Sequence, residues 1–147
     1  MVELRSDSRR VPLSTVRLKQ GAQRALEALG LGGRTLGVLL TDDRRIARLH
    51  ERWMGEKGPT DVMSFSLGDA AAPRLLGDVV ISVETAARCL PAGQARRPRA
   101  VAREVQRCLI HGILHLAGYD HRTPAQRQRM ERQARRLARI APSEVVG

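Results

Sequence analysis

Residues 111–121 read HGILHLAGYDH and hold three of the four histidines of the chain. His111 and His115 stand four residues apart, so on an α-helix their side chains lie one turn apart on the same face. Gly118 can adopt a left-handed conformation and end that helix, which would bring His121 back toward the other two. The spacing therefore predicts a metal site of three histidines with one coordination position open.

An open site of three histidines is typical of catalytic zinc, whereas structural zinc sites usually have a fourth protein ligand. Cys108 precedes His111 by three residues and could be that ligand, although cysteine is among the most buried residue types and a half-buried thiol packed in the core is expected here. One zinc ion is the predicted cofactor, and nickel or copper would also suit three imidazoles. We interpret His50, the fourth histidine, as a solvated helix residue without a partner.

The three histidines and Gly118 occupy the positions of the HExxHxxGxxH motif of metzincin peptidases, but Gly112 replaces the glutamate. In those peptidases the glutamate is the base that accepts a proton from metal-bound water. The expected catalytic group is therefore a metal-bound water held by His111, His115 and His121, and we identify no protein general base. Phosphodiester cleavage should tolerate this loss better than peptide cleavage, because it depends more on positioning and charge stabilisation. A metzincin-like metallopeptidase is a minor alternative.

The charge of the chain indicates an anionic partner. Its 147 residues include 26 Lys and Arg against 15 Asp and Glu, a formal net charge of +11. Between Arg96 and Arg139 the sequence has twelve arginines and three acidic residues. Such a field attracts polyanions such as nucleic acids, although the excess of arginine over lysine could also reflect genome composition. One Trp, one Tyr and one Phe are too few for a base-stacking surface of the RRM or OB type.

The length suits one domain, which we place at residues 1–147. No apolar run is long enough to cross a membrane, and the N-terminal segment lacks the apolar stretch of a signal peptide. Cys89 and Cys108 are the two cysteines, and their spacing suggests a reducing compartment rather than a disulfide framework. We therefore expect a cytoplasmic protein that does not bind membranes.

Hydrophobic periodicity and turn residues predict nine elements in the order β-α-β-α-β-β-α-α-α. The strands at 61–67 and 76–82 are expected to be antiparallel neighbours, because the loop between them is short. In the second helix, Ile46, Leu49 and Trp53 share one face. The fold class is α+β, with one small mixed β-sheet packed with about five helices. Strands are expected at 2–5, 35–40, 61–67 and 76–82, and helices at 14–29, between the cap at Thr41-Asp42-Asp43 and Gly55, at 83–90, at 99–117 and after the capping box at Thr123.

Three segments of the sequence resemble the YbeY family of bacterial endoribonucleases and rRNA maturation factors. HGILHLAGYDH is similar to the family signature H-G-x-L-H-L-x-G-Y-D-H. PTDVMSF at 59–65 is similar to P-T-D-V-L-S-F, and LGDVVIS at 76–82 is similar to G-D-I-x-I-S. The order and approximate spacing match from about Leu36 to Leu137, so the resemblance covers most of the chain.

The resemblance implies a zincin-like metal site in a zinc-dependent, single-strand-specific endoribonuclease. Its partner would be rRNA in ribosomal subunits, with no DNA-specific binding. Its role would lie in ribosome biogenesis, in maturation of the 3′ end of 16S rRNA and in ribosome quality control. The attacking group, a metal-bound water or the 2′-hydroxyl of the RNA, stays open. The implied zinc ligands are His111, His115 and His121.

The resemblance also implies that Thr60, Asp61 and Ser64 line the cleft, where small polar groups can position a phosphate or orient a ligand. The alternative is that this segment is simply an edge strand with a capped start.

The chain departs from the family pattern shortly before Pro59, where many members have an arginine in a Y-R-x-K-D pattern and this chain has Met54. Arg52 or Lys57 could supply the missing charge, and Arg103 and Arg107 are further candidates for RNA contacts. A cation at position 54 would stabilise the transition state of hydrolysis. Its absence should therefore reduce the rate of hydrolysis more than the affinity for RNA. This departure favours an alternative to the endoribonuclease, namely a non-catalytic RNA-binding ribosome-assembly factor with a structural metal.

Overall fold

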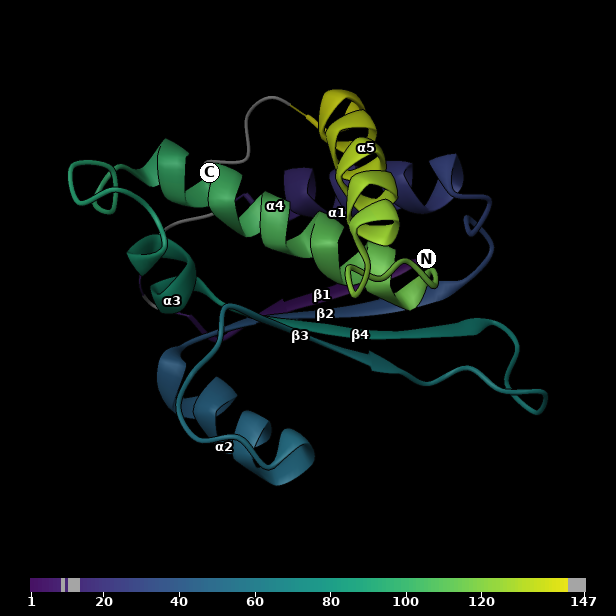
Figure 1. Ribbon diagram of the computed structural model, residues 1–147, viewed down its shortest axis with the longest axis horizontal. Coiled ribbons are helices and arrows are strands. Elements are labelled where there is room, and N and C mark those ends of the chain that lie inside the picture. The colour runs from purple at the N-terminus through teal and green to yellow at the C-terminus, as the bar shows by residue number, and fades with distance from the viewer. Residues whose placement is uncertain (9, 11–13, 143–147) are drawn as a thin grey trace.

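The computed structural model describes residues 1–8, 10 and 14–142. Within them, a four-stranded sheet is packed with five helices (Figure 1), which confirms the predicted α+β class, mixed sheet and order of elements. The predicted bounds differ from the observed ones by one or two residues. The strands are β1 (Val2–Ser6), β2 (Thr35–Thr41), β3 (Val62–Ser66) and β4 (Leu75–Ser82), and the helices are α1 (Thr15–Ala28), α2 (Asp43–Met54), α3 (Val83–Arg88), α4 (Pro98–Leu116) and α5 (Pro124–Ile140).

The strands follow the order β1-β2-β4-β3 across the sheet. The strands β1, β2 and β4 are parallel, whereas β3 pairs with β4 in the antiparallel sense that the short loop predicts. In this last pair, Val62 lies opposite Ile81 and Ser66 lies opposite Gly77. The strand β3 is therefore an edge strand, and it lies beside α4, the helix that carries His111 and His115.

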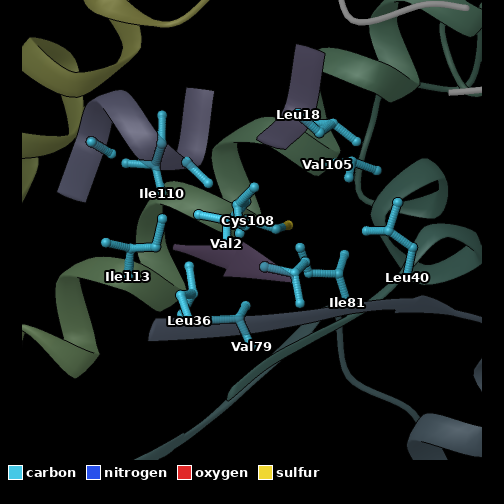
Figure 2. Packing of buried hydrophobic residues seen from close by; sticks show 14 of the residues in the cluster. Val2, Leu18, Leu36, Leu40, Val79, Ile81, Val105, Cys108, Ile110 and Ile113 are labelled. Carbon is cyan, nitrogen blue, oxygen red and sulfur yellow. The ribbon is translucent and has the colours of Figure 1, made fainter. Parts of the chain in front are cut away.

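The helices are divided between the two faces of the sheet (Figure 1). The helices α1 and α4 cover one face, α5 packs across both of them, and α2 lies on the opposite face. The main hydrophobic core lies between α1, α4 and the sheet (Figure 2), where it includes Leu36, Val79, Ile81 and Ile113. In the described residues, no helix combines the length and the apolar character needed to cross a bilayer.

Gly112 sets how closely α4 approaches the sheet. A Cβ atom at this position would lie 2.7 Å from Val79 Cγ1 and 3.1 Å from Ser64 Oγ. The hydroxyl of Ser64 donates a hydrogen bond to the Gly112 carbonyl oxygen at 3.2 Å. Because glycine has no side chain, α4 can lie directly on β3 and β4, and the turn between His111 and His115 is held at the sheet edge.

The surroundings of two residues on α2 do not follow from the sequence pattern. Ile46 is buried, but Trp53 is 60% exposed. Its ring forms a T-shaped contact with the ring of Phe65, with 6.4 Å between the centroids, and does not enter the small cluster of buried residues under α2. The interpretation of His50 as a residue without a partner is wrong, since its Nδ1 lies 2.9 Å from the Gly58 carbonyl oxygen and its Nε2 lies 3.1 Å from Glu56. A sequence pattern does not show contacts between a helix and the loop after it.

Candidate metal centre

The helix α4 ends in a turn that reverses the chain. Gly118 has a φ angle of 98°, in the region that favours glycine. Its N–H donates to the His115 carbonyl oxygen at 3.1 Å, and the Tyr119 N–H donates to the Leu114 carbonyl oxygen at 2.9 Å. These two hydrogen bonds form a Schellman motif. As the spacing predicts, His121 therefore returns to the level of the last turn of α4.

The three histidine rings lie close together. Their centroids are 4.6 Å apart for His111 and His115, 5.1 Å for His115 and His121, and 5.8 Å for His111 and His121. Within the described residues, one ring nitrogen from each histidine lies within 4.8 Å of the others, which is close enough for one shared ion. A tetrahedral zinc ion, with Zn–N distances of about 2.0–2.1 Å, holds its nitrogen ligands about 3.3 Å apart. The cluster therefore fits one divalent ion after small ring rotations.

The chemistry of the nitrogens also fits a metal ion. His115 Nδ1 lies 3.1 Å from the Tyr119 carbonyl oxygen, which can only accept a hydrogen bond. Nδ1 is therefore the donor to this carbonyl, which leaves Nε2, 3.0 Å from His111 Nε2, as the nitrogen that can bind a metal ion. Burial, together with the charges of His115 and His121, lowers the pKa of His111 to about 4. The His111 ring is therefore neutral at physiological pH, as a metal ligand must be.

Asp120 stiffens the exposed turn that carries His121. The His121 backbone N–H donates to Asp120 Oδ1 at 2.8 Å, and Arg122 Nε lies 3.1 Å from Asp120 Oδ2. The backbone hydrogen bond holds the pKa of Asp120 below its usual range. We did not single out Asp120 or the Tyr119 carbonyl from the sequence, because a backbone oxygen leaves no side-chain pattern and Asp120 reads as an ordinary turn residue.

Cys108 takes no part in the cluster. Its side chain is 1% exposed and lies in the main core (Figure 2), so the thiol is fully buried and not half-buried as expected. Burial raises the pKa of this thiol to about 12, which keeps it protonated. Among the described residues, the cluster therefore consists of three histidines, the number of protein ligands that leaves a position open in catalytic sites.

A cavity of about 490 Å³ between α4 and α5 reaches the cluster. His111 and His121 line it together with three arginines, Arg107, Arg127 and Arg135. The cavity beside the cluster therefore presents three arginines and one acid, Glu131, and its net positive lining suits an anionic substrate. Arg107 is one of the arginines predicted from the sequence, but Arg127 and Arg135 were missed, because the basic character of α5 does not show which of its faces meets α4.

The family model described as Endoribonuclease YbeY matches residues 3–141. The chain belongs to the YbeY endoribonuclease family. Curated relatives that carry this name agree. A protein of Anaeromyxobacter sp. (strain Fw109-5) is 46% identical over 139 residues, which cover 94% of this chain and 70% of the relative. Another, from Geobacter metallireducens, is 37% identical, and the match covers 97% of each chain.

A solved structure has a similar overall fold. The solution structure of a protein from Thermotoga maritima matches with a TM-score of 0.57 and covers 93% of this chain and 89% of that one. The two sequences are 21% identical, so this likeness concerns the fold alone.

The segment that resembles the PTD motif of the YbeY family lies at the start of β3. Asp61 Oδ1 accepts a hydrogen bond from the Val62 N–H at 2.9 Å, and Asp61 Oδ2 lies 4.0 Å from Arg107 Nη2. Thr60 is half-buried in the loop before the strand. Asp61 caps the start of β3, and Asp61 and Ser64 also contact α4. That Thr60, Asp61 and Ser64 line the cleft stays a prediction.

The residues at the position of the family arginine lie at the end of α2. Met54 is 51% exposed. The guanidinium carbon of Arg52 lies 5.3 Å from the centroid of the Trp53 ring, a cation–π distance, and Lys57 lies in the loop that leads to β3. Neither Arg52 nor Lys57 lines the cavity beside the histidines. Their contact with RNA therefore remains a prediction. Arg107, in contrast, lines that cavity.

Proposed function

We propose that the protein is a zinc-dependent endoribonuclease that cleaves single-stranded RNA in the cytoplasm. The observation that carries this proposal is the convergence of His111, His115 and His121 at one point beside a cavity lined by arginines. Membership of a family whose relatives are named endoribonucleases supports the same activity.

We further propose that the RNA is rRNA in ribosomal subunits, with maturation of the 3′ end of 16S rRNA and ribosome quality control as the cellular roles. The family resemblance supports this finer assignment. The net charge of +11 also suits a protein that works on a large polyanion.

Each group at the site has a role in this proposal. His111, His115 and His121 would hold the ion, with the Tyr119 carbonyl orienting the His115 ring. A bound divalent ion lowers the pKa of water and neutralises charge on a phosphate oxygen. Arginines that line the cavity, among them Arg107, bind the RNA backbone through charge-assisted hydrogen bonds and hold the phosphate against the cluster.

Gly112 argues against peptide substrates. It is buried against β3 and β4, where a Cβ atom would already contact Val79 at 2.7 Å. A glutamate at this position would enter the packing between helix and sheet and would not reach the cavity. The metzincin arrangement of base and metal is therefore sterically blocked in this fold.

Removal of the metal should abolish RNA cleavage, and zinc should restore it. We expect the zinc-loaded protein to cut an end-labelled single-stranded RNA internally, and we expect chelation to lower the rate by at least about 100-fold, since the ion activates the water and stabilises the charge. Adding zinc, nickel or copper back to separate samples identifies the active metal. Duplex RNA of the same sequence and casein are the controls, and both should stay intact. Cleavage at the full rate by metal-free protein would refute the proposal.

A further inference from the structure

The helix α4 carries a row of arginines that leads to the histidine cluster. Arg99, Arg103 and Arg107 follow one another at intervals of four residues, and His111 and His115 continue the same interval. Residues four apart are neighbours on a helix, with a rise of about 6 Å between them. The row therefore places a cation at each turn of α4 over about 18 Å before the first histidine.

A groove beside the N-terminal half of α4 collects these arginines. It has a volume of about 840 Å³ and is lined by Arg97, Arg99, Arg103 and Arg107, with Leu90 and Gln94 contributed by the segment before α4. Arg97 and Arg103 are exposed, and in the part of the chain that the structure describes neither forms an ion pair. Their guanidinium groups are therefore available to an anionic ligand.

Glu104, the one acidic residue among the described residues that line the groove, is already engaged. Glu104 Oε1 accepts hydrogen bonds from Arg107 Nε at 2.9 Å and from Arg107 Nη2. This contact balances the carboxylate and holds the Arg107 side chain at one position. Arg97 and Arg103 remain beside this pair, so the lining of the groove keeps a positive charge.

The groove adjoins the cavity beside the metal centre. Arg107 lines both hollows, and the second one also contains His111 and His121. The two hollows therefore lie next to each other along α4, adjoin at Arg107, and together make a basic path beside this helix. No aromatic side chain is among the described residues that line the groove, so the path offers contacts to phosphates and no stacking platform.

We propose that this groove is a second RNA subsite, in which Arg97 and Arg103 bind backbone phosphates of nucleotides on one side of the cleaved bond. The inference rests on the proposed function, because the occupant is the same single strand that reaches the histidines. Arg97 lies at the N-cap of α4 and Arg103 lies one turn before Arg107, so the arginines of the subsite are spread along the helix and can meet different phosphates of an extended strand. Contacts to phosphates carry no sequence information, so this subsite binds RNA without base preference.

Charge reversal at the two unpaired arginines tests the subsite. The double variant Arg97→Glu/Arg103→Glu is compared with Arg17→Glu/Lys19→Glu, which makes the same charge change at exposed positions of α1. The probe is a fluorescent 2′-O-methyl oligouridylate, and the zinc-loaded proteins are titrated at several salt concentrations. We expect the groove variant to bind at least about tenfold more weakly, with the slope of log K against log salt reduced by about 1.4, because about 0.7 is lost per phosphate contact in single strands.

The outcomes separate the subsite from the function. If the groove variant keeps the affinity and salt slope of the wild type while the wild type binds and cleaves RNA, the subsite is wrong and the proposed function stands. An equal loss in the α1 variant would assign the effect to net charge and would also overturn the subsite. If the wild-type protein neither binds nor cleaves RNA, the proposed function itself fails. Thermal melting at the wild-type temperature shows that each variant is folded.

Discussion

Replacement of His115 by alanine should remove the metal ion and, with it, RNA cleavage. The Tyr119 carbonyl orients this ring, and its Nε2 lies 3.0 Å from His111 Nε2, so His115 stands at the centre of the cluster. The variant keeps His111 and the exposed His121, and two imidazoles bind zinc much more weakly than three. We expect bound zinc to fall from about one ion per chain to about a tenth or less, and single-turnover cleavage to fall by at least about 1000-fold. Metal analysis and cleavage are measured on the same preparation.

His50 supplies the matched control for this experiment. It is a histidine on α2 that contacts Gly58 and Glu56 and does not belong to the cluster. The variant His50→Ala should therefore keep its zinc and its cleavage rate. Equal cleavage by the wild type and by His115→Ala would indicate a contaminating nuclease and would contradict the assignment.

The same variants separate catalysis from the alternative role in ribosome assembly. If the metal were only structural, the wild type would bind RNA without cutting it, and His115→Ala would chiefly lower the melting temperature. We expect instead that the wild type cuts RNA and that folded His115→Ala retains salt-dependent RNA binding, because the arginines remain in place.

The substitution Gly112→Glu, which completes the peptidase motif, should destabilise the protein by at least about 4 kcal/mol, since it overpacks the helix–sheet contact and buries a carboxylate without a partner. The closest obstacle is Val79 Cγ1, 2.7 Å from where the Cβ would lie, and Ser64 Oγ follows at 3.1 Å. The measurement is the free energy of unfolding in urea. Gly93→Glu is the control, because a Cβ at Gly93 meets no atom within 4 Å, and this variant should unfold like the wild type.

A smaller substitution keeps the test quantitative. Gly112→Ala should cost about 2 kcal/mol, because an overpacking cost of about 3 kcal/mol is offset by about 1 kcal/mol from the better helix propensity of alanine. In the double variant with Val79→Ala the two costs should be less than additive, since the shorter side chain makes room for the new methyl group. A stable Gly112→Glu variant that hydrolyses casein would contradict both the packing role of Gly112 and the assignment of RNA as the substrate.

The parts of the fold and site that could be predicted from sequence are those set by local backbone geometry. The interval between His111 and His115 is one helical turn, and the left-handed conformation of Gly118 returns His121 to them, so the cluster follows from a few neighbouring residues. The short loop before β4 likewise sets the antiparallel pairing with β3. These features need no knowledge of the rest of the fold.

The parts that could not be predicted depend on contacts between distant segments. Gly112 reads as a missing glutamate in the sequence, and its role in packing becomes visible only when α4 lies on β4. Trp53 has the right spacing for a buried face, but the small cluster under α2 does not enclose it. Arg127 and Arg135 gain their position from the way α5 crosses α4, which the basic pattern of α5 does not encode.

The central claim is that three histidines hold one metal ion and leave a position open for the substrate. Anomalous diffraction at the zinc absorption edge, from crystals of the zinc-loaded protein, tests it most directly. We predict one strong peak at about 2.0–2.1 Å from a ring nitrogen of each of His111, His115 and His121, without a fourth protein ligand. A zinc ion bound elsewhere, or one that also coordinates the Cys108 thiolate in a closed site, would contradict the account.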